Sequence, residues 1–174
     1  MANCDLLNGG ITLGCSSNFG GVKKIYLTNK ENVTGATNGS PDLGISSFTM
    51  NGAALFYEFE FNKNTSSWTE ARTGDQANGV EFYTQTLTLV LNKREKTKRT
   101  AIELLGGFRE LVAVVTDYND NSWYLGAANG LIMTGNEGGS GTAKTDPNRY
   151  TLTFTGEEPE MADAVLADAI TAVI

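Results

Sequence analysis

Few residues in this chain are of a type that could carry out chemistry. Its 174 residues include no histidine and only two cysteines, Cys4 and Cys15. Without histidine, neither a Ser-His nor a Cys-His nucleophile system can form, and the usual histidine-containing metal sites are excluded. The sequence also contains neither a GxSxG nor a GxxxxGK[ST] motif. It therefore predicts a protein that is not an enzyme and that has no cofactor or metal site.

The two cysteines also bear on where the chain is made. Cys4 and Cys15 could close a short disulfide loop, but two reduced thiols are favoured in a chain synthesised in the cytoplasm. The start of the chain lacks a basic segment followed by an apolar one, and no run approaches the roughly 18 apolar residues of a membrane span. We therefore expect cytoplasmic synthesis and no membrane partner.

One polar segment has the spacing of calcium ligands. Asp117, Asn119 and Asn121 follow that spacing, but the sixth position is Ser122 rather than glycine and the twelfth is Ala128 rather than glutamate. We expect a turn in which these side chains bind the local backbone. Three other carboxylates show no spacing that selects a pair, and we expect them at the solvated surface: Asp75, Glu81 and Asp146.

The net charge of −7 and the pI near 4.6 exclude tight wrapping of nucleic acid, because the surface repels phosphate on average. Repulsion would suit a channel through which DNA slides without sticking, although an acidic surface also serves simple solubility. A basic run at residues 93–99 is short and lacks interleaved aromatic residues. It indicates a solvated helix edge or the counterpart of a neighbour's acidic surface.

The elements that position these residues are mostly strands. Residues 53–62 and 79–92 alternate between two faces with the period of a half-buried strand. Toward the end of residues 79–92, both faces become apolar. This predicts burial against the chain's own core and against another molecule, most simply a second copy. The pattern favours assembly over catalysis.

The whole chain, residues 1–174, reads as one mainly β domain of antiparallel sheets with a short central helix and a C-terminal helix. Residues 1–20 form an N-terminal arm, 63–78 a long loop between strands, and 159–174 the C-terminal helix. Asn51-Gly52 predicts a hairpin turn into residues 53–62. Further expected elements are strands at 21–28, 45–50 and 149–155, loops at 29–43 and 135–141, a helix at 100–106, and a β-meander over 110–133.

Four local sequences carry a resemblance to a known family: residues 110–117 (ELVAVVTD), 123–130 (WYLGAANG), 141–146 (GTAKTD) and 149–156 (RYTLTFTG). Together with the order of elements over residues 45–160, they make the chain resemble structural proteins of tailed bacteriophages, especially tail tube subunits. The resemblance implies a β-sandwich flanked by a helix, with six copies in a ring and rings stacked into a hollow tube. It also implies other virion proteins as partners, and DNA that passes through the lumen without sequence-specific binding.

The resemblance implies roles for individual residues as well. The lumen would be lined by Glu58 and Glu60. Contacts between subunits would involve Leu55, Tyr57, Phe59, Phe61, Trp68, Arg72, Phe82 and Val90. Other virion roles stay open at this point: a tail terminator, a head-to-tail connector or a capsid decoration protein. A β-sandwich that binds a small ligand or carbohydrate is the alternative from a different class.

Overall fold

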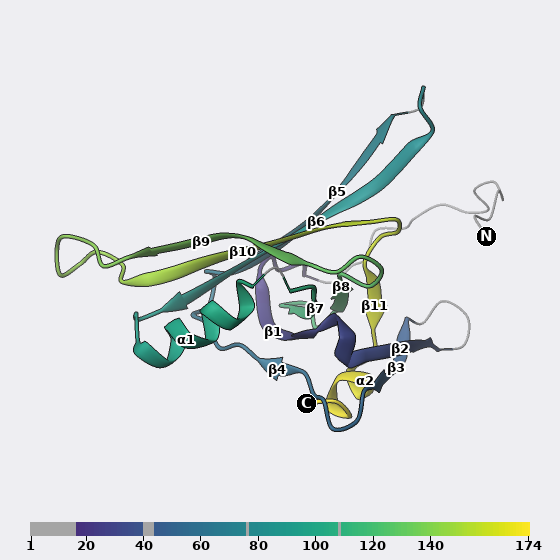
Figure 1. The fold of residues 1–174 in the computed structure, drawn as a ribbon, viewed down its shortest axis with the longest axis horizontal. Helices are drawn as coiled ribbons and strands as arrows, with labels where there is room; N and C mark the ends of the chain where they lie inside the picture. The colour runs from purple at the N-terminus through teal and green to yellow at the C-terminus, as the bar shows by residue number, and fades with distance from the viewer. Residues whose placement is uncertain (1–16, 40–43, 76, 108) are drawn as a thin grey trace.

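The computed structural model describes residues 17–39, 44–75, 77–107 and 109–174 (Figure 1). The predicted Cys4 and Cys15 thiols, and most of the N-terminal arm, lie outside the described residues. In chain order the elements are β1 (Val22–Asn29), the 3-10 helix η1 (Lys30–Asn32), β2 (Val33–Asn38), β3 (Ile45–Met50), β4 (Tyr57–Glu58), β5 (Ser67–Asp75), β6 (Val80–Asn92), α1 (Lys96–Leu105), β7 (Leu111–Asp117), β8 (Ser122–Leu125), β9 (Ile132–Gly139), β10 (Arg149–Glu158), β11 (Asp163–Val165) and α2 (Ala167–Thr171).

The strands form two packed sheets, so the predicted mainly β sandwich is confirmed. Strands make up 51% of the structure and helices 12%. One sheet has seven strands in the order β2-β3-β11-β8-β7-β1-β4, and the other has four in the order β5-β6-β10-β9. In Figure 1 the four-stranded sheet lies across the top of the seven-stranded one, and the β5-β6 hairpin projects well beyond it.

The main core fills the space between the two sheets. Strand β6 contributes Leu87 and Leu89, and β10 contributes Leu152 and Phe154, all fully buried. The facing strand β7 contributes Leu111, Ala113 and Val115. Apolar residues at every second position place one face of each strand in this core.

A second cluster covers the opposite face of the seven-stranded sheet. Val112 and Val114 of β7 pack there with Phe48 of β3, with Ile170 of α2 and with Phe56, which precedes β4. The sheet is therefore buried on both faces, which explains why residues 111–115 form a continuous apolar run instead of alternating.

A buried carboxylate fixes the turn by which the chain passes from one sheet to the other. Glu158, at the end of β10, is 2% exposed. Its Oε2 accepts a hydrogen bond from the backbone N–H of Ala128 at 2.8 Å, and its Oε1 accepts those of Asn129 and Gly130 at 3.0 Å each. Gly156 allows the close approach, because a Cβ there would lie 2.5 Å from the carbonyl oxygen of Gly130. The turn from β8 to β9 is thus clamped onto β10.

A second buried polar side chain supports the same turn from β6. The Gln85 side-chain oxygen accepts the N–H of Gly126 at 2.9 Å, and its amide donates to Glu70 Oε1 at 3.0 Å. The same Glu70 oxygen accepts the N–H of Ala162 at 2.7 Å. Two of the four crossings between the sheets, at residues 126–130 and 159–162, are therefore tied to the four-stranded sheet.

The predicted long strand at residues 53–62 is wrong. Only β4 is extended and paired, and it joins β1 rather than following a hairpin from β3. Phe56 is buried in the second cluster, and its N–H donates to the carbonyl of Val173. Along this segment Phe56 packs in the second cluster, Tyr57 is exposed, and Phe59 and Phe61 pack against the main core, so the alternation in the sequence does not correspond to one buried face.

The predicted loop at residues 63–78 is also wrong, because most of it is β5, paired antiparallel with β6 from Ser67–Thr88 to Asp75–Val80. Its polar composition reflects an outer face that stays in solvent. The same holds for residues 135–141, where β9 continues to Gly139. Strand β9 pairs with β10 in the four-stranded sheet, so the predicted meander over 110–133 is broken after β8.

The predicted C-terminal helix over 159–174 is replaced by β11 and the five-residue α2. Val165 pairs with both Ser122 of β8 and Ile45 of β3, so this segment fills the space between two strands of the sheet. Tertiary pairing there overrides the helical spacing of the apolar residues. Helix α1 starts earlier than predicted, at Lys96, and ends before Gly106 as expected. The predicted loop at 29–43 contains η1 and β2.

Candidate assembly interface

The four-stranded sheet is bounded by two long edge strands, β5 and β9, of nine and eight residues. No further strand among the described residues pairs with the outer edge of either one. An edge of this length presents a row of backbone N–H and C=O groups that can pair with another chain. The two edges are the most extensive unpaired backbone surface in the described part of the molecule.

Threonine dominates the outer face of this sheet, which points away from the core. The residues opposite the buried ones are Thr84, Thr86 and Thr88 on β6 and Thr151, Thr153 and Thr155 on β10. Thr88 lies opposite Thr153, and Thr86 lies opposite Thr155. On β5, Ser67 and Thr69 continue the same rows. The result is a polar, largely uncharged surface that spans three adjacent strands.

The β5-β6 hairpin carries this sheet beyond the body of the molecule (Figure 1). Arg72 and Glu81 on the hairpin form an ion pair with 2.6 Å between Nε and Oε1. At the tip, Asp75 accepts hydrogen bonds from the N–H of Ala77 and the side-chain amide of Asn78. Hydrogen bonds from Asn78 and Ala77 lower the pKa of Asp75. The projecting strands are thus stiffened by local polar contacts.

The turn between β9 and β10 is organised by Asp146. Its Oδ2 accepts the N–H of Ala143 at 2.8 Å, the N–H of Thr142 at 2.7 Å and the Thr142 hydroxyl at 3.0 Å. These bonds favour the ionised carboxylate, with that from Ala143 contributing most, and they lower the pKa of Asp146 below its ordinary value of 3.8.

We expect Asp146 to titrate below 3.8 in the folded protein when its side-chain carboxyl is followed by NMR. Because the folded pKa lies below the unfolded one, the carboxylate stabilises the folded turn above the unfolded pKa. That contribution is lost as the pH falls through the folded pKa. Asp146→Asn should remove this part of the pH dependence. A carboxyl that titrates at 3.8 or higher would contradict the assignment.

The predicted subunit-contact residues do not form one surface. Phe59, Phe61 and Trp68 are half-buried and pack against the chain's own main core. Trp68 also contacts Trp123 of β8, with ring centroids 5.9 Å apart. The remaining members are spread over three strands and the segment before β4: Leu55 and Arg72 are exposed, Tyr57 is 63% exposed, Phe82 is half-buried and Val90 is buried.

The predicted lumen residues Glu58 and Glu60 lie together at the edge of the seven-stranded sheet. Both are exposed, and Glu58 forms an ion pair with Lys24 at 3.6 Å. They are therefore on a different sheet from the threonine-rich face. Whether they line a pore remains a prediction.

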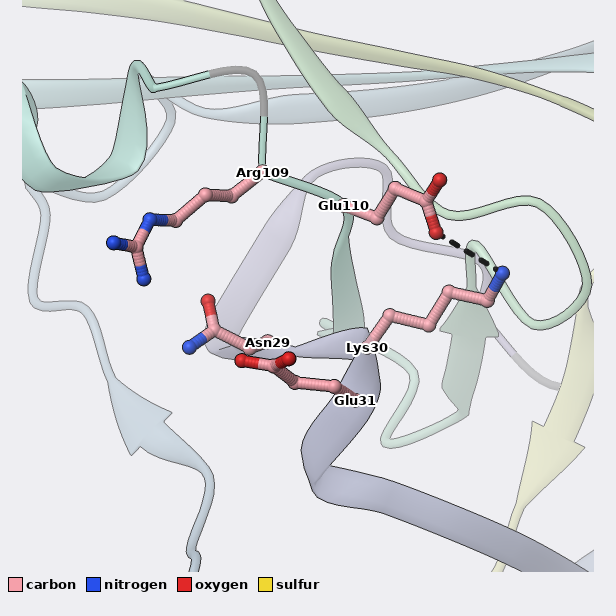
Figure 2. Close-up of a pocket in the computed structure, with 5 residues that line it drawn as sticks. All are labelled: Asn29, Lys30, Glu31, Arg109 and Glu110. Carbon is pink, nitrogen blue, oxygen red and sulfur yellow. Dashed lines mark hydrogen bonds and ion pairs between the residues drawn. The ribbon is translucent and has the colours of Figure 1, made fainter.

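A pocket of about 390 Å³ lies beside η1, lined by Asn29, Lys30, Glu31, Arg109 and Glu110 (Figure 2). Lys30 and Glu110 form an ion pair at 3.2 Å, and the Arg109 side chain extends along the side of the pocket where Asn29 lies. The lining thus carries charges of both signs at the surface. A neighbouring apolar groove of about 280 Å³ shares Asn29 and Arg109 and continues along Tyr57 and Leu104.

The segment with calcium-like spacing forms the expected backbone turn. Asp117 Oδ1 accepts the N–H groups of Asn119 and Asn121 at 2.8 and 2.9 Å. Within the described ranges, no group of three or more His, Cys, Asp or Glu side chains is arranged to hold a metal ion. In the same part of the chain, no helix is long and apolar enough to cross a membrane.

Comparison with protein-family models, with curated proteins and with solved structures found no match for this chain.

The open edges cannot be recognised from residue composition, because the polar composition of residues 63–78 and 135–141 is that of loops. A signal was present in β5, where Ser67, Thr69, Ala71 and Thr73 alternate with Trp68, Glu70 and Arg72. Alternation of this kind, with threonine at two of the outer positions, is typical of a strand with one solvated face.

Proposed function

We propose that this chain is a structural subunit of a bacteriophage tail tube that assembles through the two open edges of its four-stranded sheet. The observation that carries the proposal is the combination of β5 and β9 as long unpaired edges with a core-facing side already filled by the chain itself. Such a sheet can extend only sideways, by pairing with equivalent sheets. The virion tail is the corresponding location.

Strand direction supports closure by rotation. Each strand of the sheet is antiparallel to its neighbour, so β5 and β9 run in opposite directions. Rotation about a tube axis preserves the direction of every strand along that axis. Strand β9 of one copy therefore meets β5 of the next as an antiparallel pair, and a ring of copies forms a continuous antiparallel barrel without free edges.

The size of such a barrel suits a DNA conduit. Six copies would contribute about 24 strands, and with strands about 4.8 Å apart and tilted by about 40° they would enclose a barrel roughly 50 Å across. This barrel is wide enough for a DNA duplex. In this barrel, the threonine-rich face lines the lumen and the seven-stranded sheet lies outside. Glu58 and Glu60, which belong to the outer layer, then do not line the lumen.

A largely uncharged hydroxyl surface fits passage without binding. Lysine and arginine side chains are what hold a phosphate backbone tightly, through release of counterions. The rows of Thr84, Thr86 and Thr88 with Thr151, Thr153 and Thr155 contain none, and Arg149 at the start of β10 is the one basic residue on the same face of that strand. DNA could therefore move along this face without being retained.

The proposal is tested by electron microscopy and hydrogen exchange on the purified chain. We expect closed rings or tubes with a central hole, and assembly should slow amide exchange in β5 and β9. The edges of the seven-stranded sheet, β2 and β4, serve as internal controls and should keep their exchange rates. A persistent monomer at high concentration, or protection of β2 and β4 instead, would overturn the proposal.

A further inference from the structure

Helix α1 packs against the rest of the chain through Ile102, which is buried, and Leu105, which is half-buried against the main core. Of its ten residues only Ile102 is buried, and Leu104 is 63% exposed. An isolated helix shorter than about 12 residues is marginal in water, and most helices in proteins are stabilised by an apolar face that packs against something. Leu104 instead borders the open apolar groove beside Tyr57. The exposed side of α1 is thus available to a partner.

The start of α1 is also the most basic part of the chain. Residues 93–99 contain five basic residues and one acidic residue, a net charge of +4 in a molecule whose total is −7. Glu95 is shared between Lys93 and Lys98, and Arg99 pairs with Glu103 at 2.9 Å. Lys96 is exposed at the first position of the helix. The local carboxylates leave this surface with excess positive charge.

The opposite charge gathers after β10. Glu157, Glu160 and Asp163 are exposed, and residues 157–163 contain no basic residue. Between them Met161 is 62% exposed. Partial burial raises the pKa of Asp163, and the negative charge of Glu160 adds to this effect. A cationic partner would be attracted to this acidic segment.

The two surfaces lie at opposite ends of the four-stranded sheet. At one end, Arg149 of β10 pairs with Asn92 of β6, and the N–H of Lys93 donates to the carbonyl of Asn148. At the other end, Glu158 pairs with Tyr83. In Figure 1, α1 lies at the left of the molecule, and the connection from β10 to β11 lies at the right. In a barrel, these ends face the rings above and below.

We infer that the basic surface of α1, with Leu104, binds the acidic 157–163 segment, with Met161, of a second copy of this chain in the next ring. The contact is heterologous, so each copy uses one surface upward and the other downward, and the arrangement repeats without limit along an axis. Complementary charge fixes the polarity of stacking and disfavours head-to-head association. This inference rests on the proposed function for the ring geometry.

The test is a charge-reversal cycle on the full chain, followed by sedimentation and electron microscopy. Lys96→Glu should weaken end-to-end association by about tenfold, because it places like charges in the contact. Glu160→Lys should do the same. The combination of both should restore association to within about threefold of the original chain. Lys23→Glu makes the same change of charge on the seven-stranded sheet and should have less than about a twofold effect.

The outcomes separate the two proposals. Rings whose stacking responds equally to Lys96→Glu and Lys23→Glu, or a double variant without recovery, would overturn the inference and leave ring formation intact. End-to-end chains that obey the charge cycle but never close into rings would support the contact and overturn the tube. A chain that stays monomeric at all concentrations would overturn both. Thermal unfolding of each variant checks that a change in association is not a change in folding.

Discussion

Replacement of Glu158 by alanine is expected to lower the free energy of unfolding by about 3 kcal/mol, because three backbone N–H groups lose a charged acceptor at once. Those of Ala128, Asn129 and Gly130 all donate to this carboxylate, which is buried between the sheets. The bond from Gly130 is buried and those from Ala128 and Asn129 are partly buried. A donor shielded from water and left without a partner costs its desolvation, whereas a lost surface bond costs little. Urea unfolding followed by circular dichroism would measure the change.

Two further variants make the result specific. Glu157→Ala removes the same kind of side chain one residue away, where it is exposed, and should change the unfolding free energy by less than about 0.5 kcal/mol. Glu158→Gln should lower the unfolding free energy by an intermediate amount. Its amide keeps one oxygen that can accept a hydrogen bond, but its NH2 group faces a backbone N–H donor that it cannot accept. Equal stability of Glu158→Ala and Glu157→Ala would show that the clamp contributes nothing.

The second large effect concerns DNA passage. In particles built from this chain, Thr153→Lys adds one ammonium group per subunit to the proposed lumen and should slow DNA release on the order of tenfold. The slowing should weaken as salt is raised, because binding to phosphate depends on counterion release. Thr153 lies on the central strand β10 and is only half-buried, so the change should leave the core intact. Release can be followed with a DNA-binding dye after the particles are opened.

Thr153→Gln is the matched control, since it adds a long polar side chain without charge. It should release DNA at nearly the rate of the original particles. Equal rates for the lysine and glutamine variants would place Thr153 away from the path of DNA. Failure of the lysine variant to form particles would instead place this face at a packed interface, which contradicts a lumen position.

Strands whose pattern depends on their own residues could be predicted from the sequence. Strand β6 alternates because one of its faces meets the main core, and β7 is continuously apolar because both of its faces are covered. In each strand, the order of apolar and polar residues shows which faces are buried. For the same reason, the backbone turn at Asp117 could be predicted, since its hydrogen bonds lie within a few residues.

Elements that depend on distant partners could not be predicted. Val165 has helical spacing to its apolar neighbours, yet it is a strand residue, because β3 and β8 each present an edge with which β11 pairs. The polar residues of β5 form a strand because β6 is beside them. The candidate interface is hidden for the same reason. The threonines can be seen in the sequence, but which strands lie at the edges is known only from the order of the sheet.

Two of the four crossings between the sheets have a mechanical consequence. The segments 126–130 and 159–162 are bound to the four-stranded sheet through Glu158, Gln85 and Glu70. In the proposed tube, bending would make the inner and outer walls slide relative to each other, and these anchored crossings would resist that shear in every subunit. Flexing would then concentrate at the joints between rings.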